Sequence, residues 1–119
     1  MTTEESKDHP SMGGLRIDEI IKHLVVFSRR ANDEGYFDIV HAIALIFPKN
    51  LIEQLQELVN GPIWDGDIIS KHDRGRLMEI GLAIRVCCKG EQGYTGATYT
   101  AHSILKKIDE IKETREDKP

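Results

Sequence analysis

The sequence predicts a single, mostly helical α+β domain. Apolar residues repeat at helical spacing between residues 17 and 59, a capped segment at 70–80 ends at a glycine, and two strand-like segments flank a glycine-containing turn at 90–93. A chain of 119 residues is long enough for one hydrophobic core. We expect a disordered arm at 1–14, a single folded domain at 15–114 and a frayed tail at 115–119. The domain should hold three N-terminal helices, a capped fourth helix, a two-stranded β-hairpin and a C-terminal helix.

The arm is expected because residues 1–14 show no apolar periodicity and contain Pro10, Gly13 and Gly14. The first helix is predicted to begin near Ile17 and to fade at Asn32 to Gly35, where a glycine marks a stop. Its apolar stripe has offsets of 0, 3, 4, 7 and 8: Ile17, Ile20, Ile21, Leu24 and Val25.

Two more helices should follow before the middle of the chain. Tyr36 to Phe47 reads as a helix ended by Pro48, because proline disfavours α geometry in the residue before it. Asn50 is predicted to cap a third helix, which Asn60-Gly61-Pro62 closes. The following stretch has the turn Asp65-Gly66-Asp67 between apolar residues, and is expected to form a loop or a short strand.

The pattern is clearest from residue 70 to residue 107. Ser70 and Asp73 form a capping box, and Gly81 stands where a left-handed residue ends a helix. We predict a strand that buries alternate residues (Leu82, Ile84, Val86 and Cys88) and exposes the others (Ala83, Arg85, Cys87 and Lys89). Tyr94 to Thr100 should pair with it, and Thr100 should cap the last helix.

Charge is distributed unevenly along the chain, whose formal net charge is −4. Residues 1–69 carry six basic and twelve acidic residues, whereas residues 70–107 carry seven basic and three acidic ones. The basic excess therefore falls on the predicted fourth helix, hairpin and last helix.

Several classes of protein are disfavoured. No apolar run reaches the roughly 20 residues that span a bilayer, and the acidic N-terminus is unlike a secretory signal. Cys87 and Cys88 are adjacent, which disfavours a structural disulfide and favours a reduced cytoplasmic location. The five histidines lack metal-ligand spacing, and no catalytic constellation stands out. We expect neither an enzyme nor a cofactor, metal or membrane partner.

The stretch from Arg76 to Val86, followed by Tyr94, Thr98-Tyr99-Thr100 and Ile104-Leu105, resembles winged helix-turn-helix regulators of the MarR-like kind. In that family a recognition helix ends in a Gly-Leu step, enters a strand that carries an arginine, turns through a wing, and returns to helix after a threonine. The resemblance covers residues 70–107 and implies that the domain at 15–114 is winged-helix-like, with the hairpin as its wing.

The resemblance implies a cytosolic transcriptional regulator that binds double-stranded DNA through a basic recognition helix (70–80) and a hairpin wing (82–100). The residues it implies for DNA binding are Lys71, His72, Arg74, Arg76, Arg85 and Lys89. The alternative is a winged-helix protein-interaction module, an adaptor or an inhibitor, without DNA binding. In that reading the same charges are solvated side chains on an ordinary helix and hairpin.

Two features bear on this choice. A helix-turn-helix joins its helices by about 3–4 residues, whereas Gly61 to Ile69 separates the third and fourth predicted helices, and Asp65 and Asp67 would repel phosphate. The helices at 17–47 are also rich in apolar residues, which suggests a homodimer through them; a fully internal core is the alternative.

Overall fold

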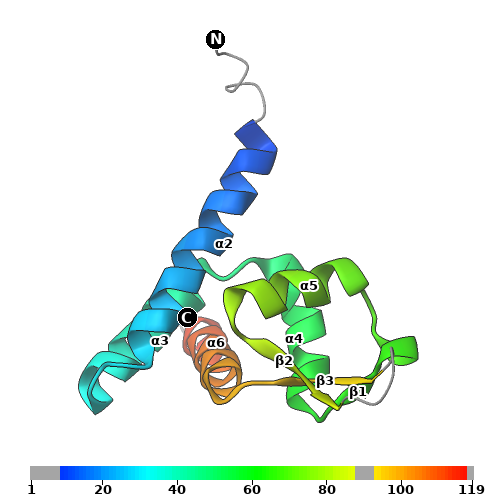
Figure 1. The fold of residues 1–119 in the computed structure, drawn as a ribbon. Helices are drawn as coiled ribbons and strands as arrows, with labels where there is room; N and C mark the ends of the chain where they lie inside the picture. Colours follow the sequence, from blue (N-terminus) through cyan, green and yellow to red (C-terminus); the bar gives the residue numbers. More distant parts are fainter. Residues whose placement is uncertain (1–8, 88–92, 118–119) are drawn as a thin grey trace.

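The computed structural model describes residues 9–87 and 93–117. These residues form an α+β arrangement that is mostly helical, with five α-helices and a three-stranded antiparallel sheet, and the coarse fold class is thereby confirmed (Figure 1). The helices are α2 (His9–Ser28), α3 (Asp33–Ile46), α4 (Ile52–Val59), α5 (Lys71–Ile80) and α6 (Tyr99–Asp117). The strands are β1 (Ile63–Trp64), β2 (Ala83–Cys87) and β3 (Tyr94–Ala97).

Helix α2 begins earlier than the apolar pattern predicts. Residues 9–14, expected in a disordered arm, are helical, and the first turns of α2 run clear of the rest of the molecule (Figure 1). Pro10 lies in the first turn, where its missing N–H has no helical partner to lose, so it does not oppose the helix. At the other end α6 continues to Asp117, so residues 115–117 of the expected frayed tail are also helical.

The helix caps differ in part from those expected. Asn32 does not stop a helix but starts one, because its side chain accepts a hydrogen bond from the Gly35 N–H at 2.7 Å. Asn50 lies inside a 3₁₀ turn (Lys49–Leu51) and does not cap α4. The side chain of Thr98, not that of Thr100, accepts from the Ala101 N–H at the start of α6.

The start and the end of α5 are as predicted. The Ser70 hydroxyl accepts from the Asp73 N–H at 3.1 Å. Gly81 ends the helix with φ of 103°, a left-handed conformation that residues with a Cβ rarely adopt.

The sheet has one strand more than the expected hairpin. Its order is β1-β3-β2, and β1 pairs antiparallel with β3 through Ile63 opposite Thr95 and Trp64 opposite Tyr94. Strand β1 lies in the segment for which the sequence allowed either a loop or a short strand. The hairpin tip, with Cys88 and Lys89, lies outside the described residues.

The predicted faces of β2 are wrong for Ala83, Ile84 and Val86, whereas Arg85 is exposed as predicted. Leu82 is buried as expected, but Ile84 and Val86 are 49% and 47% exposed, and Ala83 is buried. Helix α4 packs against β3, where Thr95 is fully buried, whereas Ile84 lies opposite Gly96 on the other face. No described element covers that other face, so the alternation of apolar residues was assigned to the wrong side.

A single core lies between the helices and the inner face of the sheet. Its fully buried members come from α2, α3, α4, α5 and α6, among them Ile21, Ile43, Leu55, Leu77 and Ile104. No single helix among the described residues is long and apolar enough to cross a membrane. Taken together, α3 and the segment Lys49–Val59 are long and apolar enough by length and composition alone, but the chain bends by 101° at the break between them.

Candidate functional site

Five of the six residues expected to bind DNA fall within the described part of the chain. Lys71 and His72 lie exposed in the first turn of α5. Arg74 and Arg76 lie further along the same helix and are partly buried, and Arg85 lies on β2. The side chains of the three arginines are turned to carboxylates of this chain.

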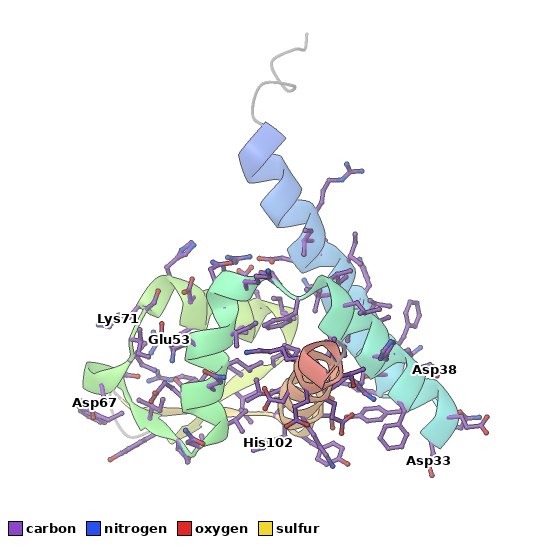
Figure 2. All side chains as sticks on the ribbon, turned by 180° about the vertical axis from the view of Figure 1, so that it is seen from behind. Asp33, Asp38, Glu53, Asp67, Lys71 and His102 are labelled. Carbon is purple, nitrogen blue, oxygen red and sulfur yellow. The ribbon has the colours of Figure 1, made fainter. Side chains whose placement is uncertain are left out.

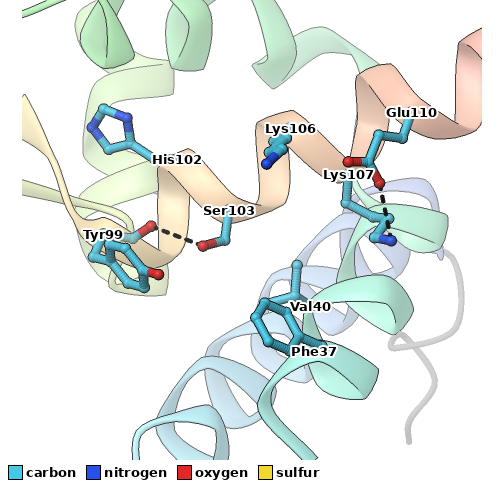
Figure 3. Close-up of a pocket in the computed structure, with 8 residues that line it drawn as sticks. All are labelled: Phe37, Val40, Tyr99, His102, Ser103, Lys106, Lys107 and Glu110. Carbon is cyan, nitrogen blue, oxygen red and sulfur yellow. Dashed lines mark hydrogen bonds and ion pairs between the residues drawn. The ribbon is translucent and has the colours of Figure 1, made fainter. Parts of the chain in front are cut away.

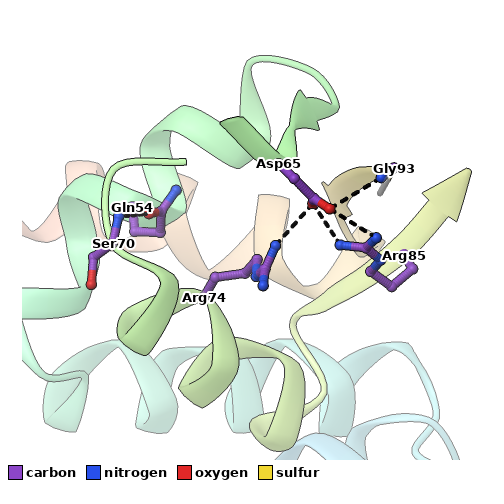
Figure 4. Close-up of polar contacts among 6 residues, drawn as sticks. All are labelled: Gln54, Asp65, Ser70, Arg74, Arg85 and Gly93. Atoms are coloured by element: carbon purple, nitrogen blue, oxygen red, sulfur yellow. Dashed lines mark hydrogen bonds and ion pairs between the residues drawn. The ribbon is translucent and has the colours of Figure 1, made fainter. Parts of the chain in front are cut away.

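Arg74 and Arg85 converge on one carboxylate, that of Asp65 (Figure 4). The Arg74 Nη1 donates to Asp65 Oδ1 at 3.0 Å, and Arg85 donates through Nη1 to Oδ1 at 2.6 Å and through Nη2 to Oδ2 at 3.1 Å. The Gly93 backbone N–H donates to Oδ2 at 3.1 Å. Three donor groups from α5, β2 and the segment before β3 therefore hold one acid.

This cluster is well shielded at its centre. The Asp65 side chain is 13% exposed, compared with 19% for Arg74 and 34% for Arg85. The hydrogen bonds from Arg85 lower the pKa of Asp65, and the Gly93 N–H and the charge of Arg74 act in the same direction against the opposing effect of desolvation. Asp65 is thus held as a carboxylate by its neighbours.

Arg76 forms a second, separate ion pair with Asp18 of α2. Its Nε donates to Oδ2 at 2.9 Å and its Nη2 donates to Oδ1 at 2.8 Å, a two-point contact that suits the planar guanidinium. Hydrogen bonding to Asp18 raises the pKa of Arg76. The pair joins α2 to α5 through two residues that are 58 positions apart along the chain.

The electrostatics of the predicted reading surface therefore differ from those expected from composition. Asp65 was expected to repel phosphate beside a basic helix, whereas its carboxylate pairs with both Arg74 and Arg85 and offsets one of their two positive charges. Lys71 and His72 remain exposed on α5, together with the acidic Glu79. Among the described residues, the strong basic patch that the charge count suggested is largely absorbed into ion pairs.

Sequence reasoning missed Gln54, which is 1% exposed within α4. Its Oε1 accepts from the Ser70 N–H at 2.9 Å, which ties α4 to the start of α5 (Figure 4). The available signal was its position: Gln54 stands three residues after Leu51 and four before Leu58, at the spacing of the buried stripe of α4. The partner itself lies 16 residues away, and no local pattern identifies it.

Exposed apolar side chains gather along α2. We call Ile17, Ile20, Leu24 and Phe27 the α2 seam: the four residues are spaced 3, 4 and 3 apart, as in a helix that packs against another helix. Ile20 is 49% exposed and Phe27 is 59% exposed, and Leu24 is partly buried against the core. A different stripe of α2, with Ile21 and Val25, faces the core of the molecule.

A shallow groove of about 470 Å³ lies between α3 and α6 (Figure 3). Phe37 and Tyr99 line one part of it, and Lys106, Lys107 and Glu110 line another. The Tyr36 hydroxyl donates to Ser103 at 2.9 Å, and Lys107 pairs with Glu110 at 3.1 Å. No group of three or more histidine, cysteine or acidic side chains within the described residues is placed to hold a metal ion.

Comparison with protein-family models, with curated protein sequences and with solved structures returned no match. Function is therefore inferred from the geometry of this chain.

Proposed function

We propose that this chain is a winged-helix protein-interaction module that forms a homodimer through α2. The observation that carries the proposal is the α2 seam: three of its four residues, Ile17, Ile20 and Phe27, are exposed, while a different stripe of the same helix serves the core. Exposed apolar stripes of this kind mark contact surfaces in soluble proteins. The ion pairs of Arg74, Arg76 and Arg85 favour protein binding over phosphate binding at the other end of the molecule.

The order of the elements supports the winged-helix assignment. Helix α4 leads through β1 into α5, and α5 leads into the β2–β3 hairpin and then α6. Strand β1 adds to the hairpin at β3, so that α5 is bracketed by strands of one sheet. The turn Asp65–Asp67 stands where a helix-turn-helix has the helix that precedes its recognition helix.

Charge points to how two copies would meet. Arg16 and Arg30 lie exposed along the side of the α2 seam that faces away from the core. Exposed acids, Asp33, Glu34 and Asp38, lie in the first turns of α3, where Asp33 and Asp38 point outward (Figure 2). Packing α2 on α2 would set the arginines of the two copies near each other. Packing α2 of one copy on α3 of the other would bring the α2 arginines close to the α3 acids. A two-fold axis produces this contact twice, once for each copy.

The test is the solution mass from light scattering during size-exclusion chromatography, at several protein concentrations. Ile20→Glu places two carboxylates in the interface and removes half-exposed apolar surface, which we expect to weaken association by about a hundredfold or more. Val26→Glu is the matched control, because Val26 is exposed on the same helix but lies on the side opposite the seam. The proposal is contradicted if the unaltered chain has a monomeric mass at a protein concentration of about 100 μM, since a specific dimer should have a dissociation constant well below that concentration.

DNA binding is the second candidate, and the exposure of Lys71 and His72 in the first turn of α5 favours it. Duplex affinity measured across a salt series distinguishes the two, because a protein that neutralises phosphates weakens steeply as salt rises. For a DNA reader, Lys71→Ala lowers the affinity and flattens this slope. Absence of duplex binding at low salt rejects this candidate and leaves the interaction module.

A further inference from the structure

We infer that the groove between α3 and α6 binds a nucleobase together with its neighbouring phosphate, with the base stacked on Tyr99 and the phosphate at Lys106. A free nucleotide and a single-stranded nucleic acid both present this unit. The inference does not depend on the proposed homodimer, since neither the α2 seam nor the acids at the start of α3 line the groove.

The ring of Tyr99 is exposed and is held in place from behind. It stacks on the ring of Tyr36, with the centroids 6.1 Å apart and the planes 24° apart. Tyr36 is itself fixed, because its hydroxyl donates to Ser103 at 2.9 Å and its ring packs edge to face with that of Phe37. Tyr99 is nevertheless 74% exposed. A ring that is ordered before binding loses little conformational freedom when a base stacks on it.

Positive charge lies beside this ring on the same helix. His102 and Lys106 follow Tyr99 at offsets of 3 and 7, so they share one face of α6, and both are exposed. Lys107 pairs with Glu110, whereas Lys106 has no ion pair with any other residue that the structure describes. Lys106 lies about 10 Å from Tyr99 along the helix axis, so its ammonium can meet a phosphate attached to a base stacked on the ring.

Helix α3 supplies the opposite wall of the groove (Figure 3). Phe37 is 57% exposed there, and the buried Val40 lies one turn further along α3. The volume of about 470 Å³ falls within the range of about 300–1,000 Å³ that is usual for small-ligand sites. Exposed aromatic rings also bind cations, but Lys106 would repel a cation. Apolar walls beside an unpaired lysine therefore favour an aromatic ligand that carries a negative charge.

The experiment uses the full chain and two probes. Adenosine monophosphate is titrated and followed by NMR, and a fluorescent single strand of deoxyadenosines is followed by anisotropy across a salt series. Unlabelled duplex of the same length competes with the single strand. A base inside a duplex has no free face to stack, so duplex should compete less well than unlabelled single strand.

Variants of Tyr99 test the stacking. Tyr99→Leu keeps apolar bulk but removes the ring, and we expect it to weaken the binding of each probe that binds by at least about fivefold, in line with the contribution of an aromatic ring to base binding. Tyr99→Phe keeps the ring and should bind within about twofold of the unaltered chain. Circular dichroism shows that each variant is folded, and the high exposure of Tyr99 favours folding of both.

Variants of the lysines test the phosphate contact. Lys106→Ala should weaken the single strand and reduce its salt slope by about 0.7, the value for one phosphate contact on a single strand. Lys112→Ala is the matched control, because Lys112 is exposed on the same helix but does not line this groove. Ile20→Glu, which disrupts the proposed homodimer, should leave the affinity for both probes unchanged. Failure of the homodimer is thereby separated from failure of this site.

The outcomes divide cleanly. Binding of adenosine monophosphate with the expected Tyr99 pattern supports a nucleotide site, and binding confined to the single strand with that pattern supports a nucleic-acid site. The inference is overturned if neither probe binds at up to about 1 mM, or if Tyr99→Leu binds as tightly as Tyr99→Phe. It is also overturned if duplex competes better than single strand and Lys71→Ala abolishes the binding, because the contact then belongs to α5.

Discussion

At the scale of single residues, the carboxylates decide what the basic residues do. The sequence shows that Arg74, Arg76 and Arg85 fall in a basic segment, but it does not show that Asp18 and Asp65 reach them. The partners lie 9, 58 and 20 residues away along the chain. Pairing over such separations depends on the fold, and local charge patterns do not reveal it.

The Asp65 cluster makes a pH-dependent contribution to stability. Because the pKa of Asp65 is lowered in the folded state, its ionised form stabilises the fold above about pH 4, the unfolded value, and this contribution is lost as the pH falls through the folded value. The difference in free energy of unfolding between the unaltered chain and Asp65→Asn should be constant from pH 7 to pH 5 and shrink below pH 4. Urea titrations at each pH measure it. A difference that persists unchanged at pH 2 contradicts this assignment.

The ion pair of Arg76 with Asp18 should stabilise the packing of α2 on α5. Both side chains are about one-fifth exposed and make two hydrogen bonds, so we expect Arg76→Ala to lower the free energy of unfolding by about 1–2 kcal/mol. Lys22→Ala, an exposed change on α2, should cost less than about 0.5 kcal/mol. Urea unfolding measures both, and equal effects of the two substitutions would show that the pair adds nothing.

At the scale of elements, the capped helix α5 was the most predictable part of the chain. Its start at Ser70 and its end at Gly81 follow from local hydrogen bonding and backbone geometry. The starts of α2, α4 and α6 were less predictable. Pro10 lies in the first turn of α2, Asn50 lies near the start of α4 without capping it, and Thr98 has the capping role that was expected of Thr100. The faces of β2 could not be read either, since both faces carry apolar residues and only the position of α4 decides which is covered.

Gly75 within α5 and Gly81 directly after it give a matched test of this helix. Gly81 has φ of 103°, and a Cβ there would lie 3.3 Å from Val25 Cγ1, so Gly81→Ala should lower the free energy of unfolding by about 1–3 kcal/mol. A Cβ on Gly75 meets nothing within 4 Å, so Gly75→Ala should raise the free energy of unfolding by about 0.5–1 kcal/mol. Thermal melting of the two variants measures both signs. A stabilising Gly81→Ala would contradict the structure of this helix end.

At the scale of the whole molecule, the sequence predicted the number and order of the helices but not the third strand or the surface left uncovered. Strand β1 has only two residues, too few for a recognisable alternation of apolar and polar residues. It forms by antiparallel pairing with β3. The excess of apolar residues between 17 and 47 divides in the structure: Val25, Ile43 and Phe47 are buried, while Phe27 and Leu45 are more than half exposed. The interaction module proposed here depends on that exposed share.

Hydrogen exchange measured at low and high protein concentration tests the homodimer most directly, because it locates the contact without altering the chain. The account predicts that backbone N–H groups of α2 around Ile17 to Phe27 and of the first turns of α3 exchange more slowly at high concentration. Exchange in α5 and in the sheet should not change with concentration. Exchange in α2 that is independent of concentration up to about 100 μM, or slowing confined to the exposed sheet face at Ile84 and Val86, would contradict it.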